Sequence, residues 1–217
     1  HYVALQQLHV VLAVDHAGLV GEDGETHQGM FDVGYLRQVP EMVVYSPASH
    51  AEMEQMLRAA IYECKGPAAI RYPRGSEGEY RGLRDGPRIC EGTDCTVLTY
   101  GSVVNSVLEL ERLCRSAGIS LEILKPGVIA PLDFAPIFES VKKTGRLLVV
   151  EECADHGCLA DEIFAELACR GIPVRGAKRN LGSAFIPHGS VPELYKLTGL
   201  DAGSLYPLVL EVMQREK

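Results

Sequence analysis

Short apolar runs of four or five residues recur along the chain, and amphipathic stretches separate them. In the first part, runs at 10–14, 42–45 and 68–72 fit buried strands, and 53–61 has apolar residues at helical spacing. Strands that alternate with helices form parallel sheets, because a crossover must return the chain to the start of the next strand. Residues 1–74 therefore predict part of a parallel-sheet α/β domain.

The same alternation returns in the second half of the chain. Further runs fit strands at 96–100, 121–124, 147–150 and 172–175, with helices between them. A last amphipathic helix follows Asp201, its predicted N-cap. Residues 75–93 are polar and rich in glycine without a sustained period, so they predict a linker that could include a strand at 88–90. Residues 94–217 then predict a second, complete α/β domain.

The composition argues against several classes of protein. The net charge of −8 disfavours nucleic acid or an anionic membrane as the main partner. No apolar run approaches the ~20 residues of a membrane span. The seven cysteines lack the close pairs of a zinc site and the even count of a disulfide framework. We therefore expect reduced thiols and a cytoplasmic protein without a membrane partner.

The segment Asp15–Gly29 is the strongest candidate for chemistry. It follows the first apolar run and contains four glycines and two histidines. Glycines let a backbone approach a ligand, and a histidine near an aspartate offers proton transfer near neutral pH. Open α/β sheets bind ligands at the carboxyl ends of their strands. His27 and Asp23 are therefore candidate catalytic residues, and His16 could face the same site. An ordinary loop with an Asp-Gly turn stays open as the alternative.

Two arginines close the run at 68–72. Arg71 and Arg74 could bind a phosphate or a carboxylate, and surface salt bridges are the equally open alternative. Glu151 with Glu152, and His188, are weaker candidates, because strand-end acids and loop histidines more often have structural contacts. The sequence has neither a P-loop nor a dinucleotide fingerprint.

Three segments carry a resemblance to a known family: DHAGLVGEDGETHQG, MFDVGYLRQVPEMVVYSP and AAIRYPRG. Together they resemble the 1-deoxy-D-xylulose-5-phosphate synthases, which are transketolase-like thiamine diphosphate enzymes. The GEDG-x-THQ core is common to transketolases, whereas RYPRG at 71–75 and FIPHG at 185–189 favour the synthase branch. The resemblance covers the whole chain. It implies the later part of a pyrimidine-binding domain, a linker, and a transketolase C-terminal domain, in a homodimer.

The resemblance also implies a reaction. Such transferases condense pyruvate with D-glyceraldehyde 3-phosphate to 1-deoxy-D-xylulose 5-phosphate and CO2, a precursor in isoprenoid, thiamine and pyridoxal biosynthesis. They use thiamine diphosphate and Mg²⁺. By the matching motif, His27 would handle protons, Asp23 would hold substrate oxygens and Arg74 would bind the acceptor phosphate. His16 stands where the family usually has an arginine that shares this phosphate.

The resemblance places the ligands of the diphosphate and Mg²⁺, and the glutamate that faces the pyrimidine, upstream of His1. No cofactor or metal ligand is therefore predicted here, and we expect the isolated chain to be inactive. The start within an apparent helix at 2–8 favours a fragment. A subunit of a split transketolase and a non-catalytic dimerisation module are the alternatives. We also expect the loop 16–30 to be mobile without cofactor.

Overall fold

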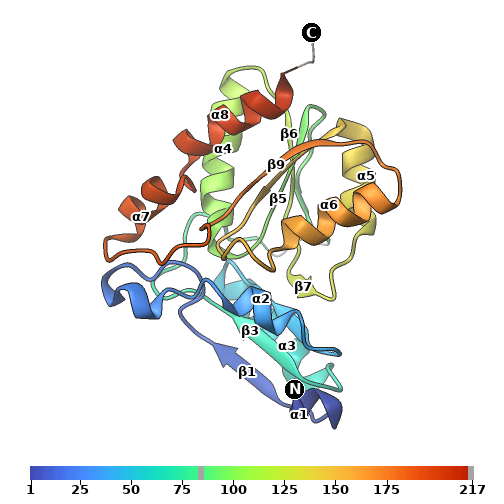
Figure 1. Cartoon of the computed structure of the whole chain (residues 1–217), viewed down its shortest axis with the longest axis vertical. Coiled ribbons are helices and arrows are strands. Elements are labelled where there is room, and N and C mark those ends of the chain that lie inside the picture. Colours follow the sequence, from blue (N-terminus) through green and yellow to red (C-terminus); the bar gives the residue numbers. More distant parts are fainter. Residues whose placement is uncertain (83–85, 215–217) are drawn as a thin grey trace.

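The computed structural model describes residues 1–82 and 86–214, which form two α/β units in contact (Figure 1). The first unit holds a four-stranded sheet in the order β1-β3-β2-β7. Strands β1, β3 and β2 are parallel, which confirms the parallel sheet predicted for this part. Its elements along the chain are α1 (Tyr2–Leu5), β1 (Val11–Val14), α2 (Asp32–Leu36), β2 (Val43–Tyr45), α3 (His50–Tyr62) and β3 (Ala68–Arg71).

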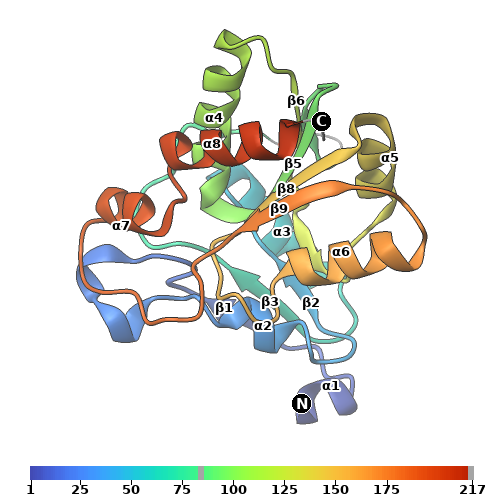
Figure 2. The same cartoon turned by 45° about the horizontal axis from the view of Figure 1, so that its top comes forward.

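The second unit is a five-stranded sheet in the order β4-β6-β5-β8-β9, parallel except for β4. Figure 2 shows helices on both of its faces. Its elements are β4 (Arg88–Cys90), β5 (Cys95–Thr99), α4 (Val104–Ser116), β6 (Leu121–Leu124), β7 (Val128–Ala130), α5 (Ala135–Thr144), β8 (Arg146–Val150), α6 (Leu159–Cys169), β9 (Arg175–Arg179), α7 (Val191–Thr198) and α8 (Ala202–Met213). The α/β class predicted for this half is confirmed, as is the strand at 88–90.

Strand β7 joins the two units, because it leaves the second unit and pairs antiparallel with β2 of the first. This strand was not predicted, since three apolar residues between prolines are too few for a periodicity. One cluster of buried side chains also crosses the junction. It combines Val33, Val44 and Ala69 of the first unit with Leu98 and Val149 of the second. The junction is therefore a continuous core, although the predicted boundary at 75–93 remains a prediction.

Local capping signals account for the starts of α3, α7 and α8. Ser49 accepts a hydrogen bond from the Glu52 amide, and Asp201 accepts one from the Ser204 amide. The strand predicted at 172–175 was misplaced, because β9 occupies 175–179. This edge strand reads RGAKR and is only partly buried, so it lacks the apolar run that marks central strands. Among the described residues, no helix has the length and apolar character needed to cross a bilayer.

Candidate functional site

The segment after β1 forms a closed loop at the carboxyl end of the first sheet. The amides of Gly18 and Gly29 each donate to the other residue's carbonyl oxygen, both at 2.8 Å. A Cβ at Gly29 would lie 1.9 Å from the carbonyl oxygen of His16, so this close approach requires glycine. Two short 3-10 turns, Gly21–Asp23 and Glu25–His27, form the end of the loop.

The loop brings the four predicted site residues together. Asp23 forms an ion pair with Arg74, which follows the neighbouring strand β3. The Nε2 atom of His16 lies 3.5 Å from the same Asp23 carboxylate, and the rings of His16 and His27 are 6.1 Å apart. Because β1 and β3 are parallel neighbours, their carboxyl ends meet at one edge of the sheet. The sequence thus predicted this grouping correctly, whereas the role of each residue stays a prediction.

These side chains remain accessible to a ligand. The side chain of Arg74 is 56% exposed, those of His16 and Asp23 are 30% and 24% exposed, and His27 is also exposed. Exposed ion pairs contribute little to folding, because water already solvates both charges. A phosphate could therefore replace Asp23 as the partner of Arg74 at small cost. The cluster offers one exposed guanidinium, one carboxylate and two imidazoles to a solute.

Arg71 is a different case, although it is only three residues from Arg74. Its side chain is 3% exposed, and Nε and Nη2 donate to the Asp32 carboxylate at 2.6 and 3.4 Å. Burial lowers the pKa of the Arg71 guanidinium, and the Asp32 carboxylate more than reverses this, so the pKa is raised. Of the two possibilities that the sequence left open for Arg71, the structure shows a salt bridge, which is buried and does not lie at the surface.

The strand-end acids Glu151 and Glu152 do not act as a pair. The Glu151 carboxylate accepts the amides of Leu159 and Ala160 at 2.9 and 2.8 Å and so caps α6. Glu152 instead accepts the amide of Leu19 from the first unit at 2.7 Å. Burial raises the pKa of both carboxyl groups, and these hydrogen bonds oppose the rise. The contacts of both acids are structural, which is the more common role of acids at a strand end and the one favoured by the sequence analysis.

His188 and a cavity beside Arg74 lie outside the cluster of the four predicted site residues. His188 is exposed and makes no hydrogen bond or ion pair within residues 1–82 and 86–214. A cavity of about 520 Å³ begins beside Arg74 and extends to Glu152, along the junction of the two units. The junction therefore leaves space next to the candidate site.

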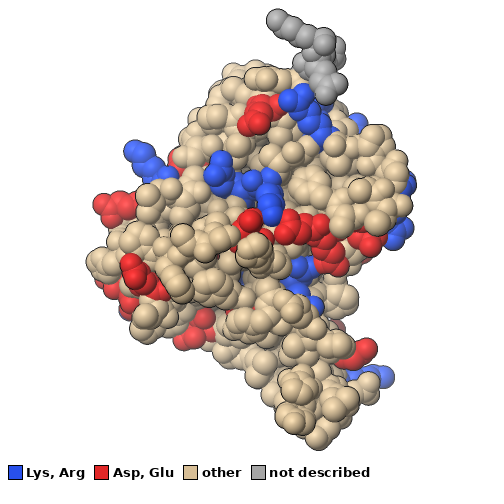
Figure 3. All heavy atoms as spheres, in the orientation of Figure 1, with Lys and Arg blue, Asp and Glu red and all other residues tan. Residues whose placement is uncertain are grey.

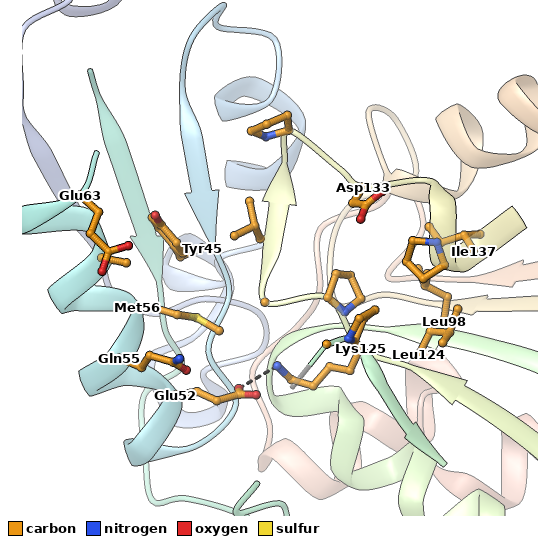
Figure 4. Close-up of a pocket in the computed structure, with 18 residues that line it drawn as sticks. Tyr45, Glu52, Gln55, Met56, Glu63, Leu98, Leu124, Lys125, Asp133 and Ile137 are labelled. Carbon is orange, nitrogen blue, oxygen red and sulfur yellow. Dashed lines mark hydrogen bonds and ion pairs between the residues drawn. The ribbon is translucent and has the colours of Figure 1, made fainter. Parts of the chain in front are cut away.

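A separate cavity of about 400 Å³ lies between α3 and the segment from β6 to α5 (Figure 4). Lys125 reaches across it, and its Nζ atom is 2.7 Å from the Glu52 carboxylate. Burial lowers the pKa of Lys125, and Glu52 opposes this. Nothing in the sequence singled out Lys125. The pair is a second buried link between the units, remote from the four predicted site residues.

The donor set of the site was compared with what a thiamine diphosphate–magnesium group needs. Mg²⁺ requires several oxygen ligands in octahedral geometry. Within the described ranges, no group of three or more His, Cys, Asp or Glu side chains could hold a metal ion. One carboxylate, one guanidinium and two imidazoles suit a phosphorylated, hydroxylated substrate instead. The described residues therefore do not fit the metal–diphosphate part of the cofactor.

Comparison with known families decides the relationship. The family model for "Transketolase, pyrimidine binding domain" matches residues 1–78, and that for "Transketolase, C-terminal domain" matches residues 85–205. The chain belongs to the transketolase family. This confirms the fold class, with part of a pyrimidine-binding domain followed by a C-terminal domain. Both matches leave residues 79–84 uncovered, inside the predicted linker.

Curated relatives refine this position and confirm the resemblance to the synthases. The chain is 40% identical over 210 residues to the 1-deoxy-D-xylulose-5-phosphate synthase of Chlorobium phaeovibrioides, which covers 93% of the chain and 33% of that protein. It is 32% identical over 225 residues to that of Heliobacterium modesticaldum, covering 100% and 35%. The chain thus spans about a third of the length of the curated relatives it matches.

A solved structure shares the fold. The chain resembles a protein described as "Split gene transketolase, inactive beta4 tetramer", with a TM-score of 0.80 and 25% identity. The match covers 96% of this chain and 68% of that one. Both units therefore keep the arrangement found in a transketolase.

Proposed function

We propose that this chain is the acceptor-binding and proton-transferring part of a 1-deoxy-D-xylulose-5-phosphate synthase. The full enzyme would condense pyruvate with D-glyceraldehyde 3-phosphate and release CO2. The observation that carries the proposal is the cluster of Asp23, His27 and Arg74 at one sheet edge, in a chain whose curated relatives bear that name. The product would feed isoprenoid, thiamine and pyridoxal biosynthesis, as the resemblance implies.

Each side chain has a role that its surroundings allow. Arg74 would bind the acceptor phosphate with its exposed guanidinium, which can form bidentate hydrogen bonds. Asp23 would then exchange its contact with Arg74 for hydroxyl groups of the substrate. His27 would donate or accept a proton at a substrate oxygen. His16 would approach the phosphate beside Arg74, as the weaker counterpart of the family's arginine.

Thiamine diphosphate, when bound, would supply the electron sink for decarboxylation and carbon–carbon bond formation. We propose that the ligands of its diphosphate and of Mg²⁺ lie outside this chain, in agreement with the donor set described above. The chain alone would then be inactive. In the full enzyme, a cytoplasmic homodimer would bring this site and the cofactor ligands together. Exposed apolar side chains on α1 and β1, on a largely uncharged end of the molecule, suit such an interface (Figure 3).

A subunit of a split transketolase is the second candidate. The structural neighbour that supports it is a split-gene transketolase, of which this chain covers 68%. The two candidates differ in substrate preference, because a transketolase takes a ketose phosphate as donor, whereas the synthase takes pyruvate. Feeding both donors to the same preparation separates them.

The test joins this chain to the amino-terminal part of the synthase of Chlorobium phaeovibrioides. With thiamine diphosphate, Mg²⁺, [2-¹³C]pyruvate and glyceraldehyde 3-phosphate, we expect labelled 1-deoxy-D-xylulose 5-phosphate in the ¹³C spectrum. The control is the amino-terminal part alone, which should form none. Turnover of a ketose phosphate without turnover of pyruvate would favour the split transketolase. A folded joined protein that uses neither donor would contradict both candidates.

A further inference from the structure

The loop that carries Asp23 and His27 has few contacts with its own sheet. The Gly18–Gly29 pair closes its base, and the amide of Ala17 donates to the carbonyl oxygen of Tyr72. Beyond the base, Val20 donates to the Gln28 side chain, again within the loop. Outside the base, the exposed Arg74 side chain also holds the loop to the end of β3 through its ion pair with Asp23, and the remaining contacts come from the second unit.

The second unit contacts the loop at two places: the Pro187 carbonyl oxygen accepts from Gln28 Nε2 at 3.5 Å, and Glu152, directly after β8, reaches the loop's base. Its side chain is 3% exposed, and its Oε1 atom accepts the Leu19 amide at 2.7 Å across 133 residues of sequence. Its Oε2 atom accepts the Ser102 hydroxyl at 2.9 Å, and the Tyr195 hydroxyl also interacts with the carboxylate. Two hydroxyl groups of the second unit therefore hold the Glu152 carboxylate in the position from which it contacts the loop.

The loop is shaped to receive this carboxylate. Gly18 has φ of +79°, and a Cβ there would lie 2.2 Å from the carboxyl carbon of Glu152. The Leu19 side chain, 3% exposed, packs into the core of the second unit beside Val103 and Leu194. A backbone hydrogen bond, a glycine contact and a buried side chain thus converge at residues 18–19.

We propose that Glu152 is a positioning residue, which fixes the loop carrying Asp23 and His27 from the second unit without touching substrate. This inference rests on the proposed function for its catalytic meaning. A buried hydrogen bond to a charged acceptor is among the stronger single contacts in a protein. Because a displacement of ~1 Å can slow catalysis about 100-fold, such a contact can govern turnover from a distance.

Glu151 provides a matched control. It is the same residue type, adjacent in sequence, and equally buried, but its carboxylate caps α6 instead of the loop. Replacing either acid removes a buried carboxylate and its amide contacts. Of the two alanine variants, only Glu152→Ala should release the loop.

The first experiment measures hydrogen–deuterium exchange on the chain itself. Glu152→Ala should speed exchange of amides in 18–29 about 10-fold or more, with little change in α6. Glu151→Ala should speed exchange at 159–160 and leave the loop unchanged. Glu152→Gln keeps an acceptor for the Leu19 amide and should restore most of the protection. Equal loosening of the loop in both alanine variants, an unchanged loop in Glu152→Ala, or no rescue by glutamine would overturn the proposal.

If Glu152→Ala does not fold, Ser102→Ala replaces it, because this change removes the hydroxyl that donates to Oε2 and keeps the carboxylate. Exchange in 18–29 should then rise about 3-fold, and an unchanged loop would contradict the proposal. In the joined protein, Glu152→Ala should lower kcat about 100-fold while KM for the phosphorylated acceptor changes less than about 3-fold. Arg74 follows β3 and is not part of the loop, so its contact with the acceptor phosphate should persist. If the joined wild type lacks activity, the proposed function fails, and the exchange pattern still decides the role of Glu152.

Discussion

Arg71 and Arg74 leave the same strand three residues apart, and their surroundings are opposite. Arg71 is buried against Asp32, and its cation also lies 5.6 Å from the centre of the Tyr100 ring. Arg74 is 56% exposed and pairs with the Asp23 carboxylate, which is 24% exposed. The contrast separates structural charges from functional ones. Charges in the interior are paired with each other, whereas charges at the edge of the sheet are accessible to a substrate.

The largest expected effect concerns folding. Arg71→Met removes the cation that neutralises buried Asp32, so we expect a loss of about 3–5 kcal/mol in the free energy of unfolding. Arg74→Met should cost less than about 1 kcal/mol, because its ion pair is exposed. Urea unfolding of the two variants measures both values. Similar losses in the two would erase the distinction between the arginines.

The next effect concerns turnover. In the joined protein, His27→Ala should lower kcat about 100-fold, since general acid–base catalysis commonly contributes that much. Its free energy of unfolding should change by less than about 0.5 kcal/mol, because the side chain is exposed. His188→Ala is the matched control, an exposed histidine outside the cluster, and should leave kcat unchanged. An undiminished rate in His27→Ala would remove this residue from the mechanism.

A smaller effect is expected in acceptor binding. Arg74→Ala should raise KM for glyceraldehyde 3-phosphate about 10-fold, the loss of one charge-assisted contact. KM for unphosphorylated glyceraldehyde should stay nearly constant, and this second acceptor is the internal control. A parallel rise for both acceptors would show that Arg74 does not recognise the phosphate.

The smallest expected effect is a dependence of stability on pH. Burial raises the pKa of Glu152 in the folded chain, against the opposing Leu19 amide, Ser102 hydroxyl and Arg71 charge. The folded state then binds this proton more tightly than the unfolded state, so its contribution is full below about pH 4.5 and declines as pH rises through the raised pKa. Glu152→Gln should make unfolding free energy flatter above pH 4.5. Urea titrations at several pH values check the slope, and a steeper decline in the variant would reverse the sign assigned here.

The sequence predicted which residues form the site better than it predicted the buried contacts that hold them in place. The motif and the parallel alternation were enough to place Asp23, His27 and Arg74 at one edge, because strand ends of a parallel sheet meet there. The burial of Arg71 could not be read from its neighbours, since its partner Asp32 lies 39 residues away. The same holds for the Glu152–Leu19 contact and for Lys125, which pairs with Glu52 across 73 residues. Polar contacts between residues far apart in the sequence leave no periodic pattern, so they cannot be predicted from neighbouring residues.

Strand β7 and the true position of β9 escaped prediction for a related reason. A three-residue strand between prolines and a polar edge strand both lack the apolar run by which central strands are recognised. The N-cap predicted at Asp201 was confirmed, because its donor and acceptor lie within one helical turn.

The central claim is that this chain carries the acceptor-binding and proton-transferring half of a thiamine site, while the cofactor is held elsewhere. Isothermal titration of thiamine diphosphate with Mg²⁺ tests it directly, on the chain alone and on the joined protein. We expect no binding heat from the isolated chain and clear saturable binding by the joined protein, retained in His27→Ala. Micromolar binding by the isolated chain would contradict the account.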